Sequence, residues 1–273
     1  FSGRRGADAI DGAGGYDEAE YSGDQVGVTV RLGGWVGATG ALPAGEQGSA
    51  LDGWGNIDLL RNIEGVEGSS YDDTLIGDAG NNRLDGRGGS DVLDGGEGIE
   101  WAEYNQALIG VHVDLAQGKA FDDGQGIGDA VQNAAVEVDT LVNIENVLGG
   151  FGNDRLIGDA GANVLDGAAG NDTLTGGAGD DTLLGGLGND VFFGGAGSDT
   201  MAGGEQRNVQ WSSGLPADYD RLEYNGTGGI TANLSTRTVT VAGEAGVDSY
   251  SGIEEIDGAF NQADVVTGRT SDS

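Results

Sequence analysis

Apolar residues recur at a fixed spacing of nine along much of this chain. Residues 149–202 divide into six rows of nine, and the eighth position of each row is a large apolar residue. These residues are Leu156, Leu165, Leu174, Leu183, Phe192 and Met201. Successive residues of a strand face opposite sides, so a three-residue strand centred on the eighth position turns one apolar side chain inward. The pattern predicts a series of very short strands.

The other positions of each row predict tight turns between these strands. The first and fourth positions of the six rows are always Gly, and the sixth is Asp in five rows and Asn in one. Glycine permits positive φ and close backbone approach, both of which a tight turn requires. Two rows therefore form one coil of 18 residues, with the order turn, strand, turn, strand.

The same frame recurs in three other parts of the chain. It is clear at 68–103, weaker at 3–20, and split by an insertion at 203–223, where it opens at Gly203 and resumes at Tyr219. Stacked coils place each row beside the row 18 residues later. We expect one edge to stack Asp154, Asp172 and Asp190, and the other to stack Asn163, Asp181 and Asp199. In 68–103 the expected pairs are Asp73 with Asp91 and Asn82 with Glu100.

The sixth positions are candidate metal ligands. Turn carbonyls and carboxylates together offer hard oxygen ligands in a roomy, flexible arrangement, which suits Ca²⁺ better than Zn²⁺ or Mg²⁺. We predict several Ca²⁺ ions, held by Asp8, Asp17, Asp73, Asn82, Asp91, Glu100, Asp154, Asn163, Asp172, Asp181, Asp190, Asp199 and Asp220.

The row GGxGxDxUx resembles the nonapeptide of the RTX (repeat-in-toxin) family, the haemolysin-type calcium-binding proteins. The resemblance implies an all-β fold, a right-handed parallel β-roll or β-helix solenoid with Ca²⁺ in the turns between stacked coils. It also implies export by type I secretion, with folding outside the cell. The chain departs from the pattern at Tyr71, Asn82, Glu100 and Asn163, so we expect weak or empty sites there.

A second, longer repeat separates the nonapeptide blocks. Its first strand-like segment occurs at 27–32, 110–115 and 229–234, and its second at 57–68, 138–149 and 247–258. Alternating apolar and polar residues predict half-buried strands, in coils that continue the roll without calcium. We therefore predict one continuous solenoid over 1–273 in three repeat units, 1–103, 104–223 and a truncated 224–273. Exposed loops are expected at 33–56, 116–137 and 203–218.

Composition and charge limit the classes of partner that the chain can bind. The chain has 273 residues with 57 Gly, 2 Pro and no Cys, and its formal net charge is −34. Such acidity opposes binding to nucleic acid or anionic membranes, and no apolar run approaches the roughly 18 residues of a membrane span. This composition favours disorder unless bound cations neutralise the acids. No signal peptide is visible, and the chain starts inside a repeat, so we expect a piece of a longer protein.

Catalytic motifs are missing from the sequence. His112 is the only His, and we expect it to be an exposed strand residue. The HExxH, GxSxG and P-loop motifs are absent. Glu64, Glu145 and Glu254 recur in the longer repeat, which favours a structural role in a turn. Tyr21, Tyr104 and Tyr224 each follow a nonapeptide block, where they either cover its end or, with Trp101, form a carbohydrate-stacking stripe. We favour the first role and predict that the chain is not an enzyme.

Two functional hypotheses remain. The first is a calcium-binding structural or adhesive segment of a large secreted or cell-surface bacterial protein, such as a surface layer or adhesin stalk, which stiffens on binding Ca²⁺. Its candidate partners include other copies of itself, end to end or in another arrangement. The second is an RTX module appended to a secreted protease, lipase or alginate epimerase whose catalytic domain lies elsewhere. A weaker possibility is that the loops bind extracellular polysaccharide, with Trp211 as the first residue to test.

Overall fold

The computed structural model describes residues 1–34, 36–37, 47–121, 137–204, 220–224, 230–242, 246–253, 255–258 and 265–267. All the regular secondary structure in these ranges is β-strand, and none of them forms a helix long and apolar enough to cross a membrane. The chain divides into two compact units, Phe1–Leu148 and Gly149–Ser273. The division into three repeat units stays a prediction.

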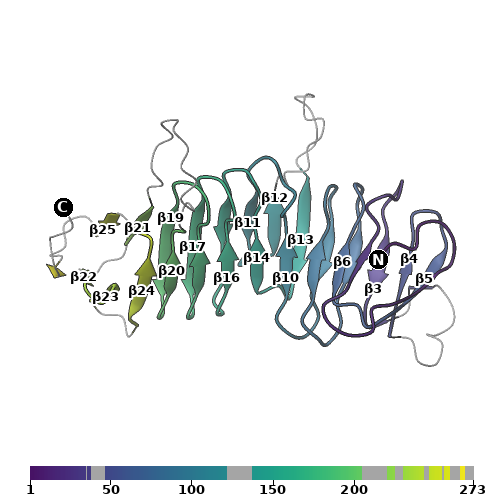
Figure 1. Cartoon of the computed structure of the whole chain (residues 1–273), viewed down its shortest axis with the longest axis horizontal. Coiled ribbons are helices and arrows are strands. Elements are labelled where there is room, and N and C mark those ends of the chain that lie inside the picture. The colour runs from purple at the N-terminus through teal and green to yellow at the C-terminus, as the bar shows by residue number, and fades with distance from the viewer. Residues whose placement is uncertain are drawn as a thin grey trace. The chain divides into compact units, whose positions relative to one another are not determined.

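The second unit is built from two facing sheets of short, mainly parallel strands (Figure 1). One sheet has the order β15 (Arg155–Ile157), β17 (Thr173–Ala178), β19 (Val191–Ala196), β21 (Arg221–Glu223) and β25 (Glu255–Asp257). The other has the order β16 (Val164–Asp166), β18 (Thr182–Leu184), β20 (Thr200–Ala202), β24 (Asp248–Ser251), β23 (Thr238–Val241), β22 (Ile230–Asn233) and β26 (Val265–Thr267). Paired residues such as Leu156 and Leu174 lie 18 apart, which confirms the 18-residue coil.

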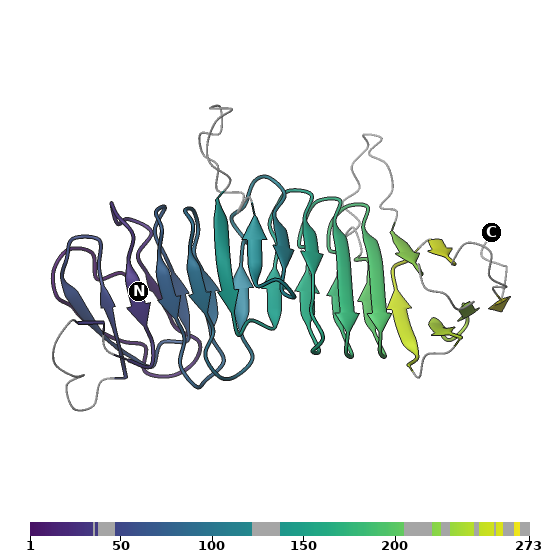
Figure 2. The same cartoon turned by 180° about the vertical axis from the view of Figure 1, so that it is seen from behind.

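The first unit has the same two-sheet plan, seen from behind in Figure 2. One sheet runs β1 (Ala9–Asp11), β5 (Ile57–Arg61), β4 (Gly48–Leu51), β3 (Thr29–Arg31), β7 (Thr74–Ile76), β9 (Val92–Asp94), β13 (Val138–Val142), β12 (Lys119–Phe121) and β11 (His112–Asp114). The other runs β2 (Glu18–Glu20), β6 (Gly65–Glu67), β8 (Arg83–Asp85), β10 (Trp101–Glu103) and β14 (Asn146–Leu148). The predicted parallel β-roll is confirmed in each unit.

The regions between the nonapeptide blocks differ from the prediction. Strand β4 pairs antiparallel with β3 and β5, and β12 pairs antiparallel with β11 and β13, so both interrupt the parallel order. The predicted loops 33–56 and 116–137 are therefore wrong where these strands lie. The sequence of β4 hid its strand character, because it lacks β-branched and aromatic residues. Its small Ser49 and Ala50 are fully buried instead, and Ser49 donates a hydrogen bond to the Gly34 carbonyl at 2.9 Å.

The core of each unit is a ladder of apolar side chains between its two sheets. In each unit the eighth-position residues are completely buried, as the sequence predicts: Leu75, Leu84, Leu93, Leu156, Leu165, Leu174, Leu183, Phe192 and Met201. Each three-residue strand contributes one such side chain, so apolar burial per residue is small. Turns must therefore supply much of the stability.

His112 is less exposed than expected. It lies on β11 with intermediate burial, and its ring packs against Phe121 of β12 at 5.5 Å between centroids. The antiparallel partner strand, which the sequence did not reveal, provides this cover.

The ladder predicts unequal effects for two leucines of one block. Leu183→Ala removes a completely buried side chain and should lower the free energy of unfolding by about 2–5 kcal/mol. Leu187→Ala removes a side chain that is 54% exposed and should change it by less than about 0.5 kcal/mol. Denaturant unfolding in saturating calcium measures both. Equal losses would contradict the ladder.

Candidate calcium-binding turns

The first glycine of each row lies against the sixth-position carboxylate of the same row. A Cβ added at Gly167, Gly176 or Gly185 would lie 2.2–2.4 Å from Oδ2 of Asp172, Asp181 or Asp190. The Cβ at Gly176 would also lie 2.5 Å from the carbonyl oxygen of Gly194, one coil further on. A carboxylate oxygen and a carbonyl oxygen therefore converge beside the glycine, in space that any side chain would fill.

Sixth-position residues stack into columns along both edges of the second unit. On one edge the amide of Asp154 donates to Asp172 Oδ1 at 2.8 Å, Asp172 donates to Asp190, and Asp190 donates to Asp220. On the other edge Asn163 donates to Asp181 at 2.8 Å and Asp181 donates to Asp199 at 3.0 Å. Asp220 joins its column although residues 205–219, outside the described ranges, separate it from Gly203. The split row therefore closes as the sequence predicts.

The first unit repeats the arrangement and extends it. The amide of Asp73 donates to Asp91 Oδ1 at 2.7 Å, and the amide of Asn82 donates to Glu100 Oε2 at 2.6 Å. Each column then continues onto a coil that has no nonapeptide row. The acceptors there are Asp58 for Asp8, Glu64 for Asp17, Asp139 for Asp91 and Glu145 for Glu100, and in the second unit Asp248 for Asp199.

Sequence reasoning missed these five acceptors as members of the columns. The available signal was the longer repeat, which places an acid at matching points of 57–68, 138–149 and 247–258. Glu254, the third glutamate of that repeat, lies outside the described residues.

Several carboxylates buried in the columns have one oxygen without a protein donor. The sixth-position side chains of 68–103 and 149–202 are nearly inaccessible to solvent. Within the described ranges, Oδ2 of Asp172, Asp181 and Asp199 and Oε1 of Glu100 have no hydrogen-bond partner, and the same is true of Oδ2 of Asp8 and Asp17. A buried carboxylate without partners is strongly destabilising unless a proton or a cation neutralises it. Carboxylate and carbonyl oxygens are the ligands that Ca²⁺ prefers, so these residues fit calcium.

Burial also raises the pKa of carboxyl groups in the columns. It raises the pKa of Asp172 to about 8, and the neighbouring Asp154 and Asp190 carboxylates add to the increase. Burial likewise raises the pKa of Glu100 to about 7, with a contribution from Glu145, and the pKa values of Asp73 and Asp199 to about 6. Without metal, these four carboxyl groups therefore hold a proton to higher pH than an exposed acid does.

Comparison with known proteins supports the interpretation of these turns as calcium-binding repeats. The family described as RTX calcium-binding nonapeptide repeat (4 copies) matches residues 67–99, 144–174 and 175–209. The chain carries RTX calcium-binding nonapeptide repeats. The matched ranges cover the two blocks in which the sequence pattern is clearest, whereas the weaker rows at 3–20 lie outside them.

Other comparisons add little to the RTX match. One similar solved structure is the crystal structure of extracellular lipase LipA from Serratia marcescens, with 19% identity and a TM-score of 0.21. The similarity covers 70% of this chain and 38% of the lipase chain, so the chain spans well under half the length of that protein. No curated protein matches the sequence.

The first RTX row on each edge differs from later rows. Oδ2 of Asp73 accepts the Ser69 amide at 2.5 Å, and Oδ2 of Asp154 accepts the Gly150 amide at 2.8 Å. In the same way Oδ1 of Asn82 and Oδ1 of Asn163 accept amides of their own turns, each at 2.8 Å. An uncharged amide oxygen is sufficient for this role, which explains why Asn is tolerated at these two positions.

Tyrosines close one edge where the columns meet the non-repeat coils. Tyr104 donates its hydroxyl to Asp139 Oδ2 at 3.0 Å, and Tyr224 donates to Asp248 Oδ2 at 2.7 Å. Tyr21 makes the longer contact to Asp58 Oδ2, at 3.5 Å. The three rings are buried, so they cannot form a carbohydrate-stacking stripe. Each hydroxyl instead supplies a donor to a carboxylate oxygen at the end of a column, which fits the junction role.

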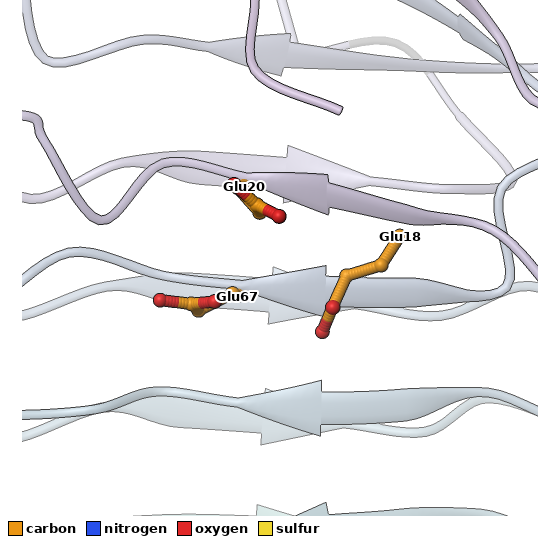
Figure 3. Close-up of side chains that lie close together, drawn as sticks. All are labelled: Glu18, Glu20 and Glu67. Carbon is orange, nitrogen blue, oxygen red and sulfur yellow. The ribbon is translucent and has the colours of Figure 1, made fainter. Parts of the chain in front are cut away.

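A separate acidic group lies outside the turns. Figure 3 shows Glu18 and Glu20 on β2 beside Glu67 on the neighbouring β6, with carboxylate oxygens within 4.8 Å of one another. Burial raises the pKa of Glu18, and the charge of Glu67 raises it further. Arg87 forms an ion pair with Glu67, so the chain itself supplies a cation to this group.

For the thirteen predicted ligands, the structure tests where each residue lies and not whether it binds calcium. The structure places all of them in edge columns, and the ligation of calcium by each individual residue stays a prediction. Trp35 and Trp211 lie outside the described residues. Trp101 is half-buried on β10, with the Arg83 guanidinium 5.0 Å from its ring centroid.

The raised pKa values predict that acid can partly replace calcium. A carboxyl whose pKa is higher in the folded chain than near 3.8 in the unfolded chain binds a proton on folding. Its stabilisation is present at low pH and is lost as pH rises through the folded-state value. In chelator, far-UV circular dichroism should show more β-structure at pH 5 than at pH 8, with a change of up to about tenfold in the folding constant per group and pH unit. Equal or greater β-structure at pH 8 would contradict this.

The glycine approach predicts a position-specific loss of affinity. Gly176→Ala would insert a Cβ between Asp181 Oδ2 and the Gly194 carbonyl, and should weaken calcium binding at that turn by on the order of 10–100-fold. Gly14→Ala is the control, because a Cβ there meets no atom within 4 Å. Calorimetric titration with Ca²⁺ compares the variants. A Gly176→Ala chain that binds like the control would exclude this turn as a site.

Proposed function

We propose that this chain is a calcium-binding structural or adhesive segment of a large secreted or cell-surface bacterial protein, and that it folds when calcium fills its columns after export. The observation that carries the proposal is that Asp172, Asp181, Asp199 and Glu100 are buried and that, within the described ranges, one carboxylate oxygen of each has no protein donor. Such columns are poorly stable when empty and unprotonated, so folding and metal binding are coupled.

Charge supports a role that begins with an unfolded chain. With a net charge of −34, the metal-free chain repels itself and stays extended where calcium is scarce. Outside the cell, ions neutralise the columns at concentrations typical of extracellular calcium modules, about 10⁻⁴–10⁻³ M. The extended, metal-free state also suits passage through a type I secretion channel.

The placement of titratable groups supports a non-catalytic role. His112, the only His, lies on β11 and packs against Phe121 of β12. The buried acids of the described residues lie mostly at repeated column positions, where one role recurs from coil to coil. A catalytic pair has no reason to recur in this way.

Detection on intact cells tests this proposal. Antibody against the segment should label cells that express the parent protein in calcium, and a calcium chelator should make the segment sensitive to protease or release it. Magnesium should not restore protection. Finding the segment folded and confined to the cytoplasm, or unaffected by chelator, would contradict the proposal.

A deletion experiment distinguishes this proposal from the hypothesis of a module appended to an enzyme. Deleting the segment from the parent protein should remove surface attachment or assembly and leave any enzymatic activity of that protein unchanged. If deletion instead abolishes a hydrolase or epimerase activity while surface attachment persists, the segment is a module that supports a catalytic domain.

A further inference from the structure

A second ladder of hydrogen bonds follows the turns, outside the carboxylate columns. It joins the fifth positions of neighbouring rows, each of which directly precedes a column residue. In the second unit the amide of Asn171 donates to Asn153 Oδ1 at 2.8 Å, and the amide of Asn189 donates to Asn171 Oδ1 at 2.8 Å. On the other edge the amide of Ser198 donates to Asp180 Oδ1 at 2.9 Å. Each bond is a rung between exposed residues that lie 18 apart, in neighbouring coils.

The first unit contains the same ladder. The amide of Ser90 donates to Asp72 Oδ1 at 2.9 Å, and the amide of Ile99 donates to Asn81 Oδ1 at 3.2 Å. Both pairs are again fifth-position residues 18 apart. The rungs therefore recur in both units and on both edges of the second unit.

The ladder also continues onto coils that have no nonapeptide row. Ser90 Oγ accepts the Val138 amide at 3.2 Å. In the second unit Ser198 Oγ accepts the Val247 amide, also at 3.2 Å. Each donor directly precedes the column acid of its coil, as a fifth-position residue does. The rungs therefore depend on stacking and not on the glycine pattern.

The side chain at the fifth position decides whether a rung forms. The acceptors within the described residues are all Asn, Asp or Ser, whose side chains carry an oxygen one or two bonds beyond Cβ: Asp72, Asn81, Ser90, Asn153, Asn171, Asp180 and Ser198. Ala162 and Ile99 have no side-chain oxygen and offer no acceptor to the next coil. Stacking at Ala162 is still regular, because a Cβ on Gly179 would lie 2.5 Å from the Gly161 carbonyl oxygen.

Each rung fixes the direction of a carbonyl group. In a trans peptide the N–H and the C=O point in opposite directions. The Asn171 amide points back to Asn153, so the Gly170 carbonyl of the same peptide group points toward the next coil. There a Cβ on Gly188 would overlap the Gly170 carbonyl oxygen. The rung therefore aligns a fourth-position carbonyl with the stacking direction.

The aligned carbonyls lie beside the carboxylate columns. A Cβ on Gly170 would overlap the Gly152 carbonyl oxygen and would lie 2.8 Å from Asp172 Oδ1, so these two oxygens converge. The rung from Asn153 to Asn171 joins the same two turns. Carbonyl and carboxylate oxygens repel when they converge alone, whereas together they suit Ca²⁺. A rung that keeps two turns at this spacing therefore favours the calcium-bound state.

We propose that the fifth-position ladder positions neighbouring turns for calcium. Each rung holds two turns at the spacing at which their oxygens converge, and so sets the calcium affinity of that pair of turns and its preference for an ion of calcium's size. The fifth-position side chains are positioning residues and do not bind the ion themselves. This inference rests on the proposed calcium-dependent function.

Removing one rung tests the inference in the full chain. Asn153→Ala removes the acceptor of the Asn171 amide, so calorimetry should show calcium binding at these turns weakened by about 2–10-fold, which corresponds to one net hydrogen bond. Asn153→Asp keeps an acceptor, as Asp180 does at its own rung, and should bind at least as tightly as the wild type. Ile99→Ala is the matched control, because Ile99 is an exposed fifth-position residue with no acceptor to lose.

A variant that adds a rung covers the case in which Asn153→Ala does not fold. Ala162→Asn places an acceptor where the row of Asp180 stacks on the row of Ala162, and should tighten calcium binding there by about 2–10-fold. Ala162→Leu has a similar size without an oxygen and should leave the affinity unchanged. Equal affinities of the two Ala162 variants, or an unchanged affinity in folded Asn153→Ala, would overturn the inference.

Strontium separates positioning from general stabilisation of the fold. Sr²⁺ also binds oxygen ligands but is larger than Ca²⁺, so turns held at a fixed spacing should discriminate against it. Asn153→Ala should therefore lower the ratio of calcium affinity to strontium affinity. A fall of both affinities by the same factor would mean that the rung only stabilises the fold, and would also overturn the inference. A wild-type chain that binds no calcium would instead overturn the proposed function, so the two failures are distinguishable.

Discussion

Neutralising stacked buried carboxylates is the constraint on which the rest of this structure depends. Each column places one acid above another at every coil, with amide donors on one oxygen and, at Asp172, Asp181 and Asp199, none on the other. Burial and mutual repulsion raise their pKa values, most clearly at Asp172. The folded chain is therefore stable only when protons or calcium ions compensate the charge, and as pH rises that role falls increasingly to calcium.

The thin core and the glycine-rich turns follow from the same constraint. With one buried apolar side chain per strand, such as Leu174 or Leu183, the two sheets bury too little apolar surface to dominate stability. Ions held at the turns can take over part of this role. The glycines are required because carboxylate and carbonyl oxygens occupy the space of a Cβ, as at Gly176. Glycine and aspartate thus recur together for one physical reason.

The sequence revealed those features that recur every nine residues. The inward position of Leu174, the pairing of Asp154 with Asp172 and the split row at Asp220 followed from the period alone. Features that break the period were missed. Glu145 and Asp139 join their columns from a coil that has no nonapeptide row to mark their places. Strand β4 was missed because its small, buried Ser49 and Ala50 have the composition of a loop.

Far-UV circular dichroism during a calcium titration at neutral pH tests the central claim most directly, with magnesium as the control ion. The account predicts a coil-like spectrum in chelator and a cooperative gain of β-structure as free calcium approaches the millimolar range, about 10⁻⁴–10⁻³ M, with no gain in magnesium. Equal β-structure in chelator and in calcium would contradict it, because the columns of buried carboxylates would then be stable without the ions.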